Sequence, residues 1–249
     1  MRNILFSLLS VALMLSACNK SAVPSGASGQ GGLRLSLQTQ EELADAAVRS
    51  NLTDYVAALP AKDAFNLTVT TSTGQQFWTG KLTEWPEDIR LNVGSYSVTA
   101  VCGSEEEEGF AKPRFAATEQ IEIAKDDTTD VLLTAKLANC MVKVTRSAAF
   151  NAFFAQSDLV LTTGAGTEIA FPATEMRPAF LEAWKFTLAG SLVTPAGTAY
   201  PFSQSFESGL KSATLYTIQM DVTSVGTPAI VVTFDNTVET VELEEDLYE

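Results

Sequence analysis

The chain has 249 residues, of which 30 are acidic and 16 basic, and its formal net charge at pH 7 is −14. A surface of this sign repels phosphate backbones and anionic headgroups, which disfavours nucleic-acid binding and membrane docking through a basic patch. The sequence contains no histidine, which removes the commonest general base, the usual serine or cysteine triad and most transition-metal sites. A glycosidase needs only two suitably spaced carboxylates, but with 30 acidic residues such pairs arise by chance and are not evidence for one. We therefore expect no enzyme, no metal and no cofactor.

Residues 1–17 have the three-part pattern of an export signal. They begin with a positive charge at Arg2, continue with an apolar run and end on two small residues. The apolar run is well short of the ~20 residues that span a bilayer as a helix. Residues 15–18 (LSAC) resemble the lipobox of bacterial lipoproteins, in which the signal is cut before the cysteine and the thiol carries a lipid such as palmitate. We therefore predict a lipoprotein signal peptide at 1–17 and lipidation of Cys18; the alternative is an ordinary secretory signal.

Residues 18–32 are predicted to form a flexible tether. Residues 21–32 read SAVPSGASGQGG, a Gly/Ser-rich composition that cannot bury a core. Each buried methylene of a lipid chain contributes ~0.8 kcal/mol, and more than one chain gives stable anchoring. We therefore expect a membrane to be a partner through the N-terminal lipid.

Short alternating segments separated by turn residues follow the tether. Leu33, Leu35 and Leu37 alternate with polar residues, the period-2 signature of a strand with one buried face. Strands are predicted at 33–37, 65–71, 75–81, 89–93, 96–101, 117–124 and 131–137. Apolar residues at helical spacing within 41–59, before Pro60, instead predict a short helix or helical turn.

A second series of strands begins near Asn139. These strands are predicted at 141–145, 159–163, 168–171, 184–192, 200–206, 216–222, 229–234 and 238–243. The density of short strands indicates antiparallel sandwiches, and the length suits two domains of ~110 residues each. We predict an all-β fold of two tandem antiparallel β-sandwich domains, Ig-like or transthyretin-like, at 33–138 and 139–249.

Several of these strands carry a family resemblance. The segments GLRLSL (32–37), LNVGSYSVTA (91–100), AKLAN (135–139), YTIQMDV (216–222) and VTFD (232–235) resemble a Bacteroidota family of two-domain lipoproteins. That family is catalogued only as a domain of unknown function and is similar in architecture to fimbrillin-like surface proteins, which build pili and adhesins. The resemblance implies an outer-membrane, lipid-anchored protein exposed at the cell surface, and it supplies no catalytic residue.

The resemblance implies a non-enzymatic role in cell adhesion, such as an accessory subunit of a fimbria-like fibre that contacts a surface protein. Two alternatives stay open: a glycan-binding lipoprotein that captures polysaccharide, and a structural lipoprotein without a specific ligand. Residues 238–249 (VETVELEEDLYE) alternate apolar and acidic side chains, which fits a protected edge strand or a strand that pairs with another subunit. Cleavage after Arg34 or Arg49, by analogy with fimbrillin maturation, would free the chain from its lipid.

Three tryptophans are the main candidates for stacking on a sugar. Trp78 and Trp184 fall in strand patterns that favour burial, whereas Trp85 falls in a loop. Trp85 is therefore the predicted ligand contact, with core packing as the alternative for all three.

The remaining polar motifs and the two cysteines indicate covalent modification or solvent exposure more than catalysis or metal binding. Asp127-Thr128-Thr129 resembles the short acceptor for O-glycosylation in this bacterial group, which makes Thr128 a candidate site. The run Glu105–Glu108 is interpreted as a solvated, mutually repelling loop tip more readily than as a calcium site. Export implies an oxidising compartment in which Cys102 and Cys140 could form a disulfide.

Overall fold

The computed structural model describes residues 29–41, 43–45, 51–207, 209–223, 229–234 and 237–242. Within these ranges the chain forms 18 strands, one short α-helix and three 3-10 turns. The all-β class predicted from the alternating segments is therefore confirmed. None of the helices in these ranges is long and apolar enough to cross a bilayer.

The first half of the chain forms one seven-stranded sheet. Its strands are β1 (Gln30–Thr39), β3 (Asn66–Thr71), β4 (Gln76–Lys81), β5 (Arg90–Asn92), β6 (Gly94–Cys102), β8 (Phe115–Ile123) and β9 (Thr128–Leu137). They are hydrogen-bonded in the order β4-β3-β6-β8-β9-β1-β5. Alternate residues point into one core, among them Leu33 of β1, Val69 of β3 and Leu133 of β9. Because β1 and β3 are far apart in the sheet yet share this core, the sheet folds back on itself.

The second half forms two facing sheets. Its elements are β10 (Cys140–Arg146), α1 (Ala148–Phe153), β11 (Leu159–Thr163), β12 (Glu168–Phe171), β13 (Ala179–Leu181), β14 (Phe186–Val193), β15 (Ala199–Phe206), β16 (Thr214–Val222), β17 (Ala229–Phe234) and β18 (Thr237–Glu242). A four-stranded sheet has the order β12-β11-β14-β15. The facing sheet has the order β18-β17-β16-β10-β13-β7, where β7 is Gly109–Phe110, and it also holds β2 (Ala44–Asp45), which pairs with β16. The apolar side chains between the two sheets form a second core.

Two short strands cross from the first half of the sequence into the second half of the fold. β2 (Ala44–Asp45) pairs in parallel with β16, and β7 (Gly109–Phe110) pairs antiparallel with β13. In the opposite direction, Met141, Phe180 and Leu215 join the first core although they belong to β10, β13 and β16. The two cores therefore meet at these strands, with no linker between them.

The two halves repeat one topology. The order β4-β3-β6-β8 in the first half corresponds to β12-β11-β14-β15 in the second, and β9-β1-β5 corresponds to β16-β10-β13. In both halves the first strand runs parallel to a late strand, β1 to β9 and β10 to β16. These two parallel pairs depart from the purely antiparallel pattern expected from the sequence, because the first strand of each half enters beside a strand that the chain reaches much later.

Helical structure differs from the expectation at two places. Within 41–59 the described residues form β2 and a single 3-10 turn, η1 (Leu52–Asp54), while residues 46–50 lie outside the described ranges. The α-helix α1 was not expected, because its six residues are too few for a helical period to show in the sequence. It is capped by Ser147, whose hydroxyl oxygen accepts a hydrogen bond from the Phe150 backbone N–H at 3.0 Å.

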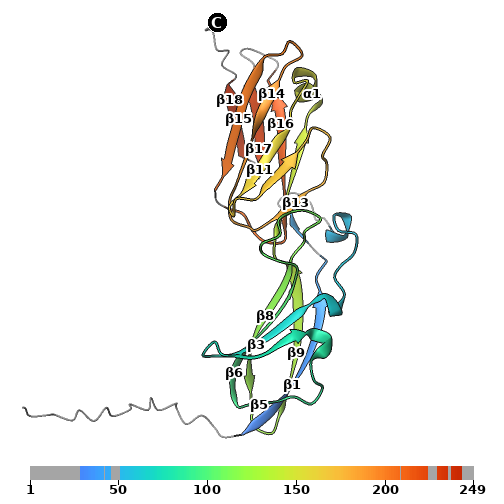
Figure 1. Ribbon diagram of the computed structural model, residues 1–249, viewed down its shortest axis with the longest axis vertical. Helices are drawn as coiled ribbons and strands as arrows, with labels where there is room; N and C mark the ends of the chain where they lie inside the picture. The colour runs from blue at the N-terminus through green and yellow to red at the C-terminus, as the bar shows by residue number, and fades with distance from the viewer. Residues whose placement is uncertain are drawn as a thin grey trace, which may run out of the picture.

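The two halves are stacked end to end along the longest axis of the molecule (Figure 1). β1 and β5 lie at one end, β13 lies near the middle, and β18 and α1 lie toward the other end. The strand that follows the tether and the last strand of the chain are thus found in opposite halves of an elongated molecule.

Candidate functional site

A partly buried ion pair lies where the two halves meet. Arg114 is 9% exposed and lies just before β8. Its Nε donates to Oε1 of Glu182 at 2.9 Å and its Nη2 donates to Oε2 at 2.7 Å. The hydrogen bonds to Glu182 raise the pKa of Arg114 above its ordinary value, although burial acts in the opposite direction. This bidentate pair joins the first half to the loop that follows β13.

Three further side chains complete this junction cluster, which we define as Glu108, Arg114, Asn139, Thr163 and Glu182. Asn139 is fully buried; its Oδ1 accepts from the Arg114 backbone N–H and its Nδ2 donates to Glu182 Oε1 at 3.3 Å. Glu108 accepts from the Glu182 backbone N–H at 2.9 Å and from the Thr163 hydroxyl. The cluster therefore connects four segments of the chain, which fixes one half against the other.

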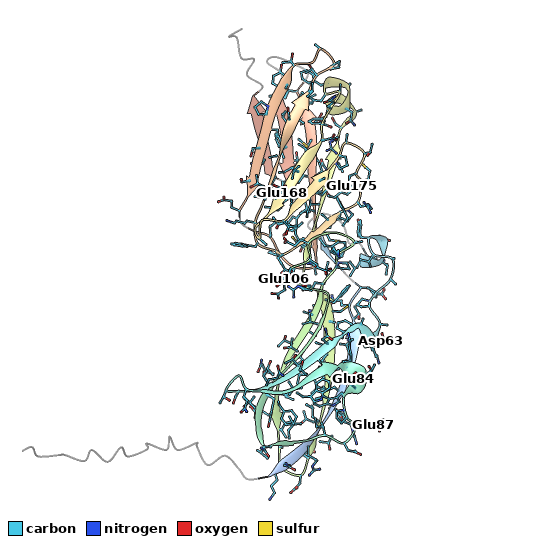
Figure 2. The ribbon with its side chains drawn as sticks, viewed as in Figure 1. Asp63, Glu84, Glu87, Glu106, Glu168 and Glu175 are labelled. Carbon is cyan, nitrogen blue, oxygen red and sulfur yellow. The ribbon has the colours of Figure 1, made fainter. Side chains whose placement is uncertain are left out.

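The acidic run before β7 is only partly the solvated tip that the sequence predicts. Glu108 lies inside the junction cluster, and the exposed Glu105 places Oε1 3.3 Å from Nη1 of Arg114. Glu106 and Glu107 are exposed, and Figure 2 shows Glu106 beside the middle of the molecule. The attraction to Arg114 offsets the mutual repulsion of the glutamates, an effect that the sequence did not indicate.

Cys102 and Cys140 are free thiols, so the disulfide that the sequence left open between them is not formed. Cys140 is fully buried in the second core, whereas Cys102 is half-buried against the first. Burial raises the pKa of Cys140 to about 12 and that of Cys102 above its ordinary value. A thiol with a raised pKa stays protonated and is a poor nucleophile.

Trp85 is not the exposed aromatic that the sequence indicated. It is half-buried and meets Trp78 edge to face, with ring centroids 5.1 Å apart. Its Nε1 lies 3.4 Å from the Leu33 carbonyl oxygen, to which it donates a hydrogen bond. It borders a groove of about 510 Å³ between residues 34–37 of β1 and the loop 82–88, on the side where Figure 2 labels Glu84 and Glu87.

Trp184 is exposed, contrary to the burial expected from the strand pattern. Its exposed fraction is 59%. β14 begins at Phe186, so Trp184 lies in the loop after β13 and the alternation of that strand does not reach it. The charged neighbours Glu182 and Lys185 were the available sequence signal for a loop.

The remaining predicted positions have simple surroundings. Thr128 is exposed at the first position of β9, and its backbone N–H donates to Asp127 Oδ1 at 2.8 Å. Arg34 is exposed in the middle of β1, with Nη1 3.9 Å from Asp130 Oδ1. Cys18 and Arg49 lie outside the described residues.

No curated protein matches the chain significantly. Among solved structures, the chain is similar to a fimbrial assembly protein from Parabacteroides distasonis, with 11% identity and a TM-score of 0.47, covering 86% of this chain and 99% of that one. It is also similar to a candidate polysaccharide-binding protein from Bacteroides thetaiotaomicron, with 12% identity, a TM-score of 0.43 and coverage of 86% and 99%. A candidate cell adhesion protein from Bacteroides ovatus gives 13% identity, a TM-score of 0.39 and coverage of 88% and 99%.

A family model matches nearly all of the described chain. Its description is "Domain of unknown function (DUF4493)", and the match runs over residues 29–248. The match spans both halves of the fold and begins at the end of the predicted tether.

Proposed function

The chain belongs to the DUF4493 family of unknown function, and we propose that it is a non-enzymatic, lipid-anchored protein of the outer membrane that acts in adhesion at the cell surface. In this proposal it serves as an accessory subunit of a fimbria-like fibre. The predicted tether is shorter than the sequence indicated, because β1 already begins at Gln30. Cys18 carries the lipid, and the residues between Cys18 and β1 lift the folded part away from the membrane.

The end-to-end arrangement of the two halves carries this proposal. β1 follows the tether directly and lies in the end half opposite to β18 (Figure 1). An anchor before β1 would therefore hold the first half near the membrane and present the second half outward. The junction cluster, with the Arg114–Glu182 pair at 2.7 Å, keeps the two halves aligned, as an extended surface protein requires.

The fibre is tested by electrophoresis of native protein from outer-membrane fractions, with unboiled and boiled samples side by side. Subunits whose sheets are completed by a neighbour's strand resist detergent until they are heated. We expect a ladder that collapses to monomer on boiling. A single monomer band in both lanes would contradict the fibre.

A truncated variant tests whether the C-terminal residues supply the strand. A chain that ends at Glu242 keeps β18 but lacks residues 243–249. We expect this variant to lose the ladder while keeping its far-UV spectrum. A length-matched variant replaces residues 243–249 by Gly and Ser, which removes the alternation of apolar and acidic side chains, and it should also lose the ladder. A ladder in this variant would contradict a role for the tail.

Membrane attachment is tested by Cys18→Ala. Without the thiol no lipid can be attached, so we expect the protein to move from the membrane to the soluble fraction and from the detergent phase to the aqueous phase. Cys102→Ala is the matched control, because it removes a thiol of the folded part, and it should stay in the membrane. Retention of the Cys18→Ala protein in the detergent phase would disprove the anchor.

Glycan binding is the second candidate function, and the exposure of Trp184 favours it. An indole that is 59% exposed presents a broad apolar face next to a polar edge. Trp85, the predicted contact, borders its own groove, but its ring is already engaged with Trp78. O-glycosylation of Thr128 also stays a proposal, supported by the exposure of this residue.

A further inference from the structure

The Trp184 indole packs against Gly164 in a tight turn. The turn connects β11 to β12 and is held by hydrogen bonds from the Thr163 N–H to the Thr167 carbonyl and from the Gly166 N–H to the Thr163 carbonyl, both at 2.9 Å. A Cβ placed on Gly164 would come within 2.6 Å of Cε3 of Trp184. The absence of a side chain at Gly164 therefore lets the indole pack directly on this turn.

A small polar pocket adjoins this aromatic platform. Its volume is about 360 Å³, and it is lined by the turn 162–166, by Lys185 and Thr187, and by Glu207 at the end of β15. Lys185 links the two features, because it lines the pocket and its Nζ lies 5.0 Å from the centroid of the Trp184 ring. The pocket thus offers an ammonium donor, a carboxylate acceptor and threonine hydroxyls beside an exposed ring.

Hydroxyl groups continue from the pocket across the outer face of the four-stranded sheet. Thr162, Thr187 and Ser205 are in register on β11, β14 and β15. The hydroxyls of Thr187 and Ser205 lie 3.0 Å apart. A row of hydroxyls beside an aromatic face matches the alternation of hydroxyl groups and apolar C–H faces on a sugar ring.

We propose that Trp184, Lys185, Thr187 and Glu207 form a binding site for a neutral glycan. One sugar ring stacks on Trp184, and the hydroxyls of that sugar or the next donate to Glu207 and accept from Lys185. An acidic glycan is disfavoured because Glu207 lines the same pocket and the whole chain carries a formal charge of −14. This inference rests on the second candidate function and assigns a site and a ligand class to it.

The alternative aromatic site is weaker on geometry. Trp85 is half-buried and packs edge to face on Trp78. Its indole N–H already donates a hydrogen bond to the Leu33 carbonyl. Trp184 combines 59% exposure with close packing against Gly164. A sugar can therefore stack on Trp184 without any rearrangement of the first core.

The test is affinity electrophoresis of the full mature chain in native gels that contain mannan, xylan or dextran as neutral polysaccharides, or polygalacturonate as the acidic one. We expect at least one neutral polysaccharide to retard the protein and polygalacturonate to have no effect. Trp184→Ala should weaken the interaction about tenfold or more. Met176→Ala, which removes another exposed apolar side chain of the second half (58% exposed), is the matched control and should bind as the native chain does.

A second variant separates the ring from its support. Gly164→Ala places a methyl group against the indole, and we expect it to weaken binding while the far-UV spectrum stays unchanged. Equal retardation of the native and Trp184→Ala proteins would overturn this site and leave glycan binding itself standing. Absence of retardation in all three neutral polysaccharides would overturn both, and retardation by polygalacturonate alone would overturn the neutral ligand class.

Discussion

The two halves of the molecule share a strand order but close their cores differently. In the first half β8 pairs with β9 at Phe115 and Ala116, which joins all seven strands into one sheet. In the second half β16, the counterpart of β9, pairs instead with β17 of the β17–β18 hairpin. The two sheets of this half therefore stay separate. The late parallel strand therefore has a different neighbour in each half.

This difference determines which backbone groups of β9 and β16 are hydrogen-bonded to a neighbouring strand. Hydrogen bonds from Gly32 to Asp127 and from Gln40 to Ala135 show that odd-numbered residues of β9 face β1. Leu132 thus faces away from β1, and it lies beyond the two residue pairs that join β8 to β9. The corresponding residue of β16 is Gln219, which is also exposed and is paired with β10 as Leu132 is paired with β1. Gln219 in turn pairs with Thr233 of β17. We therefore expect loss of the backbone N–H to be tolerated at Leu132 and not at Gln219.

Proline at these two positions should give the largest contrast. Gln219→Pro removes an N–H that β17 uses, and we expect the free energy of unfolding to fall by about 3 kcal/mol or more. Leu132→Pro removes an N–H that has no partner among the described residues, so the loss should be about 1 kcal/mol from backbone strain alone. Urea unfolding followed by far-UV circular dichroism measures both.

Alanine variants at the same positions separate the backbone from the side chain. Leu132 is 51% exposed and Gln219 is also exposed, so Leu132→Ala and Gln219→Ala should each change stability by less than about 0.5 kcal/mol. Equal losses for the two proline variants would contradict the assigned difference between the β9 and β16 edges.

The junction cluster is where the two halves are expected to become one cooperative unit. Arg114→Ala leaves Glu182 without its bidentate partner, and we expect a loss of about 2–3 kcal/mol, less than for a fully buried pair because Glu182 is 31% exposed. Arg177→Ala breaks a pair with Glu175 in which the guanidinium is 67% exposed although the carboxylate is 13% exposed, and it should cost less, about 1 kcal/mol. Calorimetry should show one transition in the native chain and two in Arg114→Ala; a single transition in both would contradict the coupling.

The alternating segments predicted most of the strands because period-2 burial is a local signal. Leu33 and Leu37 of β1 are buried as expected, whereas Trp184 was assigned to a strand that in fact starts two residues later. Partners that are distant in sequence carry no local signal. Arg114 and Glu182 are 68 residues apart, and neither their contact nor the parallel pairing of β1 with β9 could be predicted. The sequence therefore predicted the strands better than the sites.

The buried thiol should make stability depend on pH at the alkaline end. The pKa of Cys140 rises from 9.0 to about 12 because burial penalises the thiolate, so the unfolded chain loses this proton at lower pH than the folded chain does. Stability should therefore be unaffected by this group below pH 9 and fall by about 1 kcal/mol per pH unit above it. Cys140→Ala should flatten this dependence, whereas Cys102→Ala should change it less; the same alkaline slope in the Cys140→Ala protein would contradict this origin.

Thr128 gives the smallest expected effect on folding and a further contrast between the halves. It is exposed at the start of β9, while its counterpart Leu215 near the start of β16 is 7% exposed and packs in the first core at the junction. A sugar attached at Thr128 would stay in solvent, so Thr128→Ala should leave the unfolding free energy within about 0.5 kcal/mol of the native value. The intact mass of protein from its native cells should fall by the mass of one glycan in this variant. Thr129→Ala is the matched control, and a native mass equal to that of the unmodified polypeptide plus its lipid would disprove the modification.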